Sequence, residues 1–272
     1  MVSIKSLLTI LRTTRNFWIT LTLRKSSEKK EIIFRNGCKL KLTWYEYTIV
    51  RDILAKGYTV EPFDNALLFK KGDMKIVGPI PLVSVLLEDL EEIYSVDCRN
   101  KIVLDVGGFI GETAVFFSAK GAKKVIIYEP VLAHHQYIKT NLALNNVNGE
   151  LHEEGLGETD GQTNVYYENI DEGFGLVNKG PKELTIKTKS ARRIIEESGA
   201  DLAKFDCEGA EANLASIPQE VLRRIGFYII EVHTTEIKNM IVDKFQRSGF
   251  TLLKDVPNVS NKDVSMVFFQ RN

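Results

Sequence analysis

A short glycine-rich segment stands out among the residues whose spacing could support chemistry. It reads Val103-Leu-Asp-Val-Gly-Gly-Phe-Ile-Gly-Glu-Thr113, an apolar run followed by closely spaced glycines. Gly107 and Gly111 would let the backbone approach a ligand, and the first turn of a following helix offers unpaired N–H groups. The segment therefore predicts a strand, a turn and a helix that together bind a nucleotide-like cofactor.

The spacing of this segment argues against two common cofactor classes. A dinucleotide fingerprint requires G-x-G-x-x-G, but the third position counted from Gly107 is Phe109. A phosphate loop requires Gly-Lys-Ser/Thr, but Gly111 is followed by Glu112. An acidic helix start repels a pyrophosphate, whereas Asp105 could face the ammonium group of a methionine moiety. Both features favour S-adenosylmethionine, and the predicted contacts are Asp105, Gly107, Gly108 and Gly111.

A carboxylate ends the next predicted strand. Glu129 follows the apolar run Lys124–Tyr128, about 20 residues beyond the glycine-rich turn, where an acid can accept both ribose hydroxyls. Alternatively, Glu129 would only interact with the start of the next helix, which Pro130 opens. The pairing with the glycine-rich turn favours the cofactor role.

Polar groups also follow two later apolar runs. In an open α/β sheet, ligands bind at the carboxyl ends of the strands. His233 could act as a general base, because its ordinary pKa is near neutrality. Asp206 and Glu231 could instead hold a divalent cation through oxygen atoms, although no metal is assigned. The predicted acceptor-side residues are Asp206, Glu208, Glu231 and His233.

These acceptor-side residues also have structural interpretations. Asp206 could cap a following helix, with Glu208 and Glu211 complementing the helix dipole. His233 could be a satisfied structural histidine. His134 and His135 lie in a predicted helix and are expected on its exposed face.

The elements that must position these residues alternate between strand and helix from Lys101 onward. Such alternation predicts a parallel sheet with helices on both faces. Strands are expected at 101–106, 124–128, 150–154, 163–167, 183–188, 201–206, 226–232, 250–253 and 264–270, and helices at 112–120, 131–145, 191–198 and 236–248.

The first third of the chain has a different pattern and predicts a small α+β extension, residues 1–97, before a cofactor-binding domain, residues 98–272. Asn36-Gly37 between two alternating runs predicts a hairpin. A second hairpin is expected around Gly72. Helices are expected at 7–23, 44–55 and 81–93, the last of them opened by Pro81.

Taken together, the motifs resemble the FkbM family of methyltransferases. The resemblance rests on Asp105-Val-Gly-Gly-Phe-Ile-Gly111, Tyr128-Glu-Pro130, Thr140-Asn-Leu-Ala-Leu-Asn145, Lys204-Phe-Asp-Cys-Glu-Gly-Ala-Glu211 and Glu231-Val-His233. It implies an α/β fold with a seven-stranded, Rossmann-like methyltransferase sheet whose last strand is antiparallel. It also implies S-adenosylmethionine as cofactor and methyl transfer most often to oxygen. The family often has Ala-Asn where this chain has Gly108-Phe109.

The distribution of charge along the chain bears on whether the protein binds nucleic acid or a membrane. Lys plus Arg equals Asp plus Glu at 36 each, so the chain has no net positive charge. A neutral protein does not attract polyanions over long distances, and a nucleic-acid substrate is therefore disfavoured. Residues 1–30 nevertheless carry seven basic residues and one acid. Phe17 and Trp18 could anchor this segment weakly to an anionic membrane. A helix packed on the protein is the preferred interpretation.

The sequence thus predicts a methyltransferase that acts on a hydroxyl of a small molecule or sugar. The three cysteines are few and widely spaced, which suits a reducing cytoplasm. No stretch is long and apolar enough to span a bilayer. The rivals are a nucleic-acid methyltransferase and a cofactor-binding scaffold without turnover. The acceptor, the metal dependence and the oligomeric state are left open.

Overall fold

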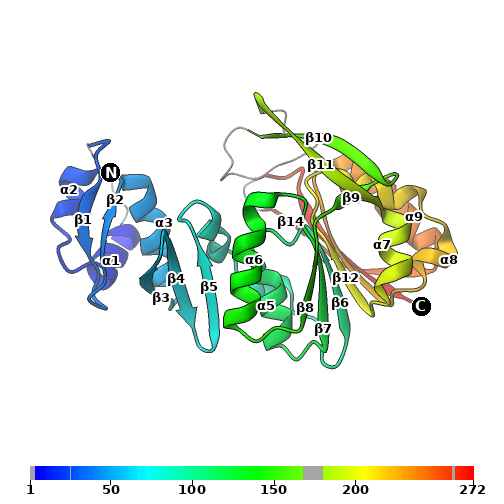
Figure 1. Cartoon of the computed structure of the whole chain (residues 1–272), viewed down its shortest axis with the longest axis horizontal. Coiled ribbons are helices and arrows are strands. Elements are labelled where there is room, and N and C mark those ends of the chain that lie inside the picture. The colour runs from blue at the N-terminus through cyan, green and yellow to red at the C-terminus, as the bar shows by residue number, and fades with distance from the viewer. Residues whose placement is uncertain (1–3, 25, 168–179, 259–260) are drawn as a thin grey trace. The chain divides into compact units, whose positions relative to one another are not determined.

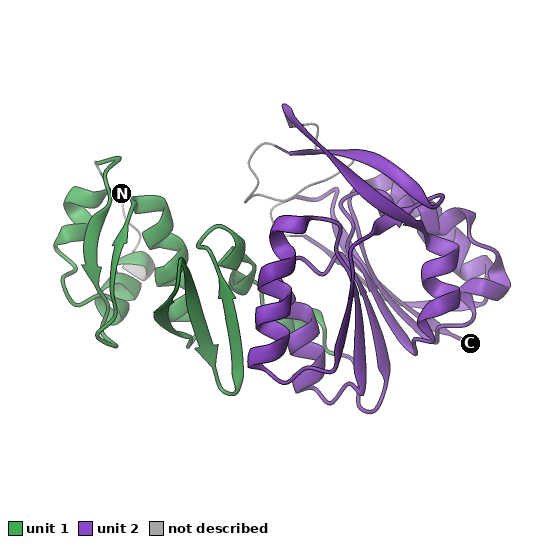
Figure 2. Cartoon of the chain, viewed as in Figure 1, with its two compact units in different colours: residues 1–95 green, residues 96–272 purple. Residues whose placement is uncertain are grey.

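The computed structural model describes residues 4–24, 26–167, 180–258 and 261–272. The chain divides into two compact units, Met1–Ser95 and Val96–Asn272, close to the expected boundary. Figure 2 shows them in different colours. All of the predicted chemistry lies in the second unit.

The first unit combines a hairpin, a three-stranded antiparallel meander and several helices. The hairpin turns at Asn36-Gly37, and the three-stranded sheet has the order β3-β4-β5. A capping box formed by Thr43 and Glu46 starts the long helix of this unit. The elements are α1 Ile4–Thr13, α2 Ile19–Leu23, β1 Lys30–Ile33, β2 Lys39–Leu42, α3 Trp44–Ala55, β3 Thr59–Phe63, β4 Ala66–Lys71, β5 Met74–Gly78, η1 Leu82–Leu87 and α4 Leu90–Ile93.

Two helices expected in this unit are broken. The helix predicted over residues 7–23 stops at Thr13, because Thr14 bridges Phe34 and the next residue bonds to the hairpin. The helix predicted over residues 81–93 becomes a 3-10 segment and a separate turn of α-helix. Asp89 causes this second break, since its side chain accepts the N–H of Glu92 and so starts a new helix.

The second unit has the expected alternation of strands and helices. Its elements are β6 Ile102–Val106, α5 Glu112–Ala119, β7 Lys124–Tyr128, α6 Leu132–Leu144, β8 Gly149–His152, β9 Gly155–Gly157, β10 Gly161–Tyr167, β11 Lys182–Ser190, α7 Ala191–Ser198, β12 Leu202–Phe205, η2 Ala210–Ser216, α8 Gln219–Leu222, β13 Phe227–Val232, α9 Thr235–Arg247, β14 Phe250–Pro257 and β15 Ser265–Arg271. Two of them, β7 and α7, have the predicted bounds. A further seven have both bounds within one residue of the prediction: β6, α5, α6, β12, β13, α9 and β15.

The main sheet confirms the predicted fold class. It has seven strands in the order β14-β15-β13-β12-β6-β7-β8. Neighbouring strands from β8 to β13 are parallel, and β15 is antiparallel to both β13 and β14. The chain moves from β6 outward to β8, then returns to β12 beside β6. The carboxyl ends of β6 and β12 therefore flank the point where the strand order reverses, the usual ligand site of such sheets.

Helices cover both faces of this sheet. Figure 1 shows α5 and α6 on one face and α7, α8 and α9 on the other. The larger apolar core lies on the second face, where Leu104, Val106 and Phe205 pack with the helices. Because side chains alternate along a strand, the residues between them point to the first face. Asp105 and Lys204 are among these.

A second, three-stranded sheet of order β10-β11-β9 extends from this unit. The loop around Asp171–Gly175, between β10 and β11, lies outside the described residues. Within the described parts of the chain, no helix is long and apolar enough to cross a membrane.

Candidate active site

The glycine-rich turn after β6 is tightly enclosed. Gly107 has a φ of 85°, and a Cβ there would collide with the backbone carbonyl of Asp206. A Cβ on Gly108 would collide with the side chain of Ile127. Gly111, with a φ of 84°, forms the N-terminal cap of α5. The backbone of β6 thus passes directly beside the backbone that follows β12, which only glycine permits.

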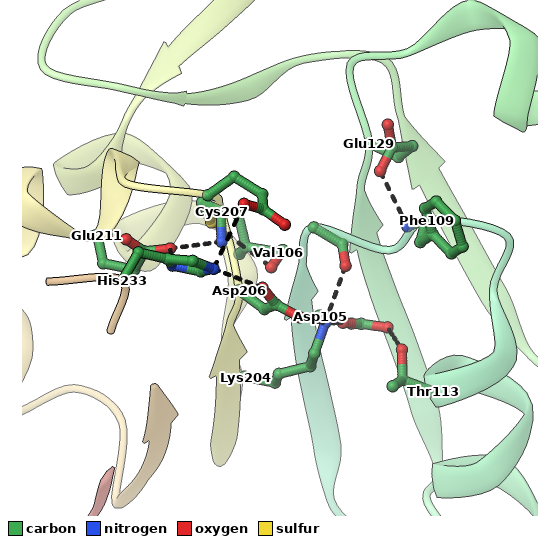
Figure 3. A network of polar contacts seen from close by, with 12 residues as sticks. Asp105, Val106, Phe109, Thr113, Glu129, Lys204, Asp206, Cys207, Glu211 and His233 are labelled. Atoms are coloured by element: carbon green, nitrogen blue, oxygen red, sulfur yellow. Dashed lines mark hydrogen bonds and ion pairs between the residues drawn. The ribbon is translucent and has the colours of Figure 1, made fainter. Parts of the chain in front are cut away.

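A buried ion pair lies beneath this turn. Lys204 in β12 is 1% exposed, and its Nζ lies 3.2 Å from Asp105 Oδ1. The same Nζ donates a hydrogen bond of 2.8 Å to the Gly107 carbonyl and lies 3.6 Å from Asp206 Oδ2. Thr113 of α5 donates to the other oxygen of Asp105 at 2.5 Å. Figure 3 shows this network linking the turn to the end of β12.

The strand register explains the pair. Lys204 lies opposite Asp105 in the parallel β6–β12 ladder, so their side chains emerge side by side. Asp105 has no exposed surface. The predicted contact between Asp105 and the ammonium group of a cofactor stays a prediction, now beside a demonstrated ion pair with Lys204. Burial raises the pKa of Asp105, and the Lys204 charge opposes that rise.

Glu129 at the end of β7 also supports the turn. Its Oε2 accepts the N–H of Phe109 at 2.9 Å, and its Oε1 accepts the N–H of Val131 at 2.9 Å. His134 Nδ1 lies 3.3 Å from Oε1. A carboxylate has about four lone-pair sites, so capacity for a further donor remains. The ribose role of Glu129 stays a prediction, now beside a demonstrated contact that ties β7 to the glycine-rich turn.

The two histidines of α6 are not on an exposed face. His134 and His135 are 2% and 3% exposed. His135 Nε2 lies 2.6 Å from the Glu129 carbonyl, and the His134 ring packs edge-on against Phe109, with centroids 4.9 Å apart. The expectation of an exposed face is wrong because α6 turns this side toward the end of β7. Both rings help to fix Glu129.

The acceptor-side residues form a cluster after β12 and β13. His233 Nδ1 lies 3.1 Å from Glu211 Oε1, while its Nε2 lies 3.5 Å from Glu208 Oε2 and 3.9 Å from Asp206 Oδ1. Glu211 is fully buried and accepts the N–H groups of Cys207 and Gly209. Figure 3 shows the His233 ring between Glu211 and Asp206.

The interpretation of Asp206 as the cap of the following helix does not agree with this geometry. Gly209, not Asp206, occupies the cap position of η2. Glu211 bonds to the backbone of the preceding loop and holds His233, so it organises the cluster. Asp206 faces two cations instead, Lys204 on one side and His233 on the other.

The cluster changes the protonation of two of its members. Burial alone would lower the pKa of His233, but the hydrogen bond to Glu211 and the nearby carboxylates outweigh it and raise that pKa to about 10. Burial raises the pKa of Glu208 to about 7; the His233 charge opposes this, and Asp206 and Glu211 add to it. His233 is thus a cation at neutral pH, which argues against its role as a free base. Glu208 titrates in the range that suits a base.

The remaining acceptor candidate is placed differently. Glu231 is half-buried inside β13, opposite Met266 of β15, whereas His233 lies beyond the end of the strand. Its assignment stays a prediction. Ligand atoms of Asp206, Glu211 and His233 lie within 4.8 Å of one another, so Glu211 rather than Glu231 completes the set that could hold a metal ion. A cation there would have to displace the His233 proton.

Two residues of the site were not among the predicted ones. Lys204 could have been suspected from the sequence, because it is the only charged residue in the apolar run Leu202–Phe205. A lysine inside a central strand must be paired. For Glu211 the sequence leaves a site role and a dipole role equally open, and nothing local in the sequence distinguishes the dipole role from the observed contacts with Cys207, Gly209 and His233.

The model of the family described as "Methyltransferase FkbM domain" matches residues 105–254, more than half of the chain. No curated protein shows significant sequence similarity to it.

Similar solved structures include several methyltransferases. TYW2 of M. jannaschii, in complex with AdoMet, has a TM-score of 0.45 at 12% identity and covers 78% of this chain and 89% of its own. A Pyrococcus horikoshii protein, provisionally described as an RNA methyltransferase, has a TM-score of 0.44 at 14% identity, with coverages of 82% and 96%. The ribosomal protein L11 methylase of Lactobacillus delbrueckii subsp. bulgaricus has a TM-score of 0.41 at 14% identity, with coverages of 72% and 82%.

Proposed function

The chain belongs to the FkbM family of S-adenosylmethionine-dependent methyltransferases, and we propose that it methylates a hydroxyl group of a small molecule or sugar. The observation that carries this proposal is the cluster of Asp206, Glu208, Glu211 and His233 beside the glycine-rich turn. The cluster combines a carboxylate that titrates near neutrality with a fixed cation. A carboxylate of this kind can act as a general base and accept the proton of an alcohol.

The residues around the turn fit the cofactor. Gly107 and Gly108 leave no room for side chains, so the backbone itself forms the wall. The acidic groups Glu112 and Glu129 at this edge disfavour a phosphate and tolerate a cationic ligand. Gly107, Gly108, Gly111 and Glu129 would hold S-adenosylmethionine, and Asp105 would act through Lys204. When bound, the cofactor supplies an electrophilic methyl group on a sulfonium.

Glu208 is our candidate for the base. Its side chain is 40% exposed, so an acceptor can reach it, and its pKa of about 7 gives a substantial carboxylate fraction at neutral pH. In this proposal its carboxylate receives the hydroxyl proton of the acceptor. His233, held by Glu211, stays protonated and limits the repulsion between Glu208 and Asp206. The buried Lys204 keeps Asp206 beside the turn.

The charge of the cluster indicates the kind of acceptor. Three carboxylates surround one imidazolium, so a phosphate or carboxylate on the acceptor would be repelled at this edge. A neutral, hydroxyl-bearing molecule such as a sugar has no such penalty. Nucleic acid, whose backbone carries a phosphate at every nucleotide, is disfavoured for the same reason.

We also propose that the reaction takes place in the cytoplasm. Cys38, Cys98 and Cys207 are all free thiols, and Cys207 lies within the candidate site. Burial, with the nearby carboxylates, raises the Cys207 pKa well above its ordinary value. A reducing compartment keeps such thiols free.

The proposal is tested by following a labelled methyl group. Purified protein and methyl-labelled S-adenosylmethionine are incubated with a cell extract separated into small molecules, nucleic acid and protein. We expect label in the small-molecule fraction, in a form stable to mild base as an ether is, and its loss with Glu208→Gln. Label that nuclease releases would overturn the proposal in favour of a nucleic-acid methyltransferase.

A parallel incubation with a chelator tests the metal. Activity that survives the chelator agrees with Glu208 as the base. Activity that is lost and then restored by a divalent cation would assign Asp206, Glu211 and His233 to a metal site instead. Cofactor binding without transfer to any fraction would support the scaffold alternative.

A further inference from the structure

The start of the first unit exposes an unusual number of large apolar side chains. Trp18 is 59% exposed and Leu21 is 71% exposed. Isolated exposed apolar residues are ordinary, but a concentration of them marks an interaction surface. Between Leu7 and Leu21 the exposed members are Leu7, Leu8, Phe17, Trp18 and Leu21, which we call the N-terminal apolar residues.

The turn that carries Phe17 and Trp18 is firmly held. Asn16, only 7% exposed, donates from Nδ2 to the Glu31 carbonyl at 3.0 Å and accepts the Ile33 N–H at 2.8 Å. The N–H of Arg15 bonds to the Ile33 carbonyl at 2.7 Å. The aromatic rings contact each other, with centroids 5.6 Å apart. They are therefore exposed on a fixed base, not on a frayed end.

The same segment is strongly basic. Residues 1–41 contain ten Lys or Arg and two Glu, a net charge of +8, and the remainder must carry −8 because the whole chain is neutral. Arg12, Arg15 and Arg24 are exposed and lie within six residues of the aromatic turn. Cationic side chains beside exposed Trp, Phe and Leu match an anionic lipid surface, which offers negative headgroups over an apolar interior.

We propose that residues 7–24 dock the protein on an anionic membrane surface, with Phe17, Trp18 and Leu21 entering the headgroup region. The helices here are too short to span a bilayer, so the contact is peripheral. A nucleic acid could bind the arginines, but it would leave the exposed leucines in water. The combination of the two residue types therefore favours a lipid surface. The inference is independent of the proposed methyl transfer.

Fluorescence of the full-length protein provides the first test. The chain has two tryptophans, Trp18 and Trp44, so Trp44→Phe leaves Trp18 as a single probe. Vesicles of phosphatidylcholine with phosphatidylserine should shift its emission to the blue, and vesicles of phosphatidylcholine alone should not. The shift should fall as salt is added, because the arginine contacts are screened. No shift with the anionic vesicles at low salt would overturn the proposal.

Co-sedimentation with the same vesicles tests the residues. Trp18→Ala with Leu21→Ala should weaken binding by about tenfold or more, through lost apolar burial. Arg15→Glu with Arg24→Glu should weaken it by at least about tenfold. Two controls should bind like the parent: Leu132→Ala, at a side chain 74% exposed in the second unit, and Arg247→Glu, at a side chain 79% exposed there.

The thermal midpoint of each variant checks that the fold is intact. Equal binding by parent and Trp18/Leu21 variants would overturn the proposal. So would a dimer in sedimentation velocity that those variants dissociate in the absence of vesicle binding, because the surface would then belong to a second copy of the chain.

Discussion

Two clusters of paired charges lie beside each other at the sheet edge, and each contains both acidic and basic side chains. The two clusters differ in their access to solvent. The Asp105–Lys204 pair is closed: one side chain has no exposed surface and the other is 1% exposed. The His233 cluster is partly open, with Asp206 and Glu208 accessible. Similar residue types therefore serve different purposes. The closed pair fixes the backbone of the turn, and the open cluster can exchange protons with an acceptor.

Asp206 belongs to both groups and connects them. One of its oxygens lies 3.6 Å from Lys204 and the other 3.9 Å from His233. A change in the closed pair should thus disturb structure first and activity as a consequence. A change in the open cluster should disturb activity with little loss of structure.

The largest expected effect is that of Lys204→Met. Removing one partner of a buried pair leaves Asp105 without compensation, which costs about 3–5 kcal/mol of stability. Loss of the Lys204 charge should raise the pKa of Asp105 further, so the loss should be greatest at high pH and smaller as the pH falls and Asp105 takes up a proton. Urea unfolding at several pH values measures it.

The matched control is the double variant Asp105→Asn with Lys204→Met, which replaces the pair by neutral groups. It should recover most of the lost stability, because no buried charge remains. Stability of the single variant within about 0.5 kcal/mol of the parent would contradict the structural role of the buried pair.

Glu208→Gln should have the next largest effect, on turnover. Loss of a general base costs about a hundredfold or more in kcat. The parent's rate should rise with pH through about 7, as Glu208 deprotonates, and the variant should lack this limb. Cofactor binding and the unfolding midpoint should stay near those of the parent. An unchanged limb in the variant would assign the base elsewhere.

Glu129→Ala should weaken cofactor binding by about one to two orders of magnitude, since each charge-assisted hydrogen bond contributes about 1.5–3 kcal/mol. Calorimetry with S-adenosylhomocysteine provides the measurement. Because Glu129 also ties Phe109 to β7, some stability should be lost as well. An unchanged dissociation constant would leave Glu129 with the structural role alone.

The smallest expected effect is that of His233→Gln on pH dependence. The His233 charge lowers the Glu208 pKa, so its removal should move the acid limb to higher pH, by about one unit or less. The parent should also lose stability as the pH rises from about 6.5 toward 10, because the folded pKa of His233 exceeds the unfolded one. The variant should lack that decline, which thermal melts can follow.

Local patterns predicted most elements of the second unit. The sequence pattern predicts Lys124–Tyr128 and Ala191–Ser198 with the observed bounds, and Pro130 starts a new element after the first of them. In the first unit, the two predicted helices that proved wrong are each broken by contacts of a single residue, Thr14 or Asp89. Thr14 pairs with Phe34, a residue distant in sequence, so no local sequence signal predicts that the first helix ends at Thr13.

The site shows the same division. The glycine turn, Glu129 and the polar ends of β12 and β13 could be read from the sequence because a ligand site at the carboxyl edge follows from strand direction. The burial of His134 and His135 could not, because it depends on how α6 is rotated against β7. The registers of β6 and β12 likewise decided that Asp105 meets Lys204.

By itself, the sequence determined the family, the alternation of strands and helices in the second unit, and the polar residues that follow β6, β7 and β12. Those properties depend on residue type and on spacing along the chain. Only the tertiary structure decided which carboxylate is buried, which is paired and which can titrate near neutrality. Solvent access and charge partners are set by residues far apart in sequence, and they alone separate the fixed Asp105 from the proton-exchanging Glu208.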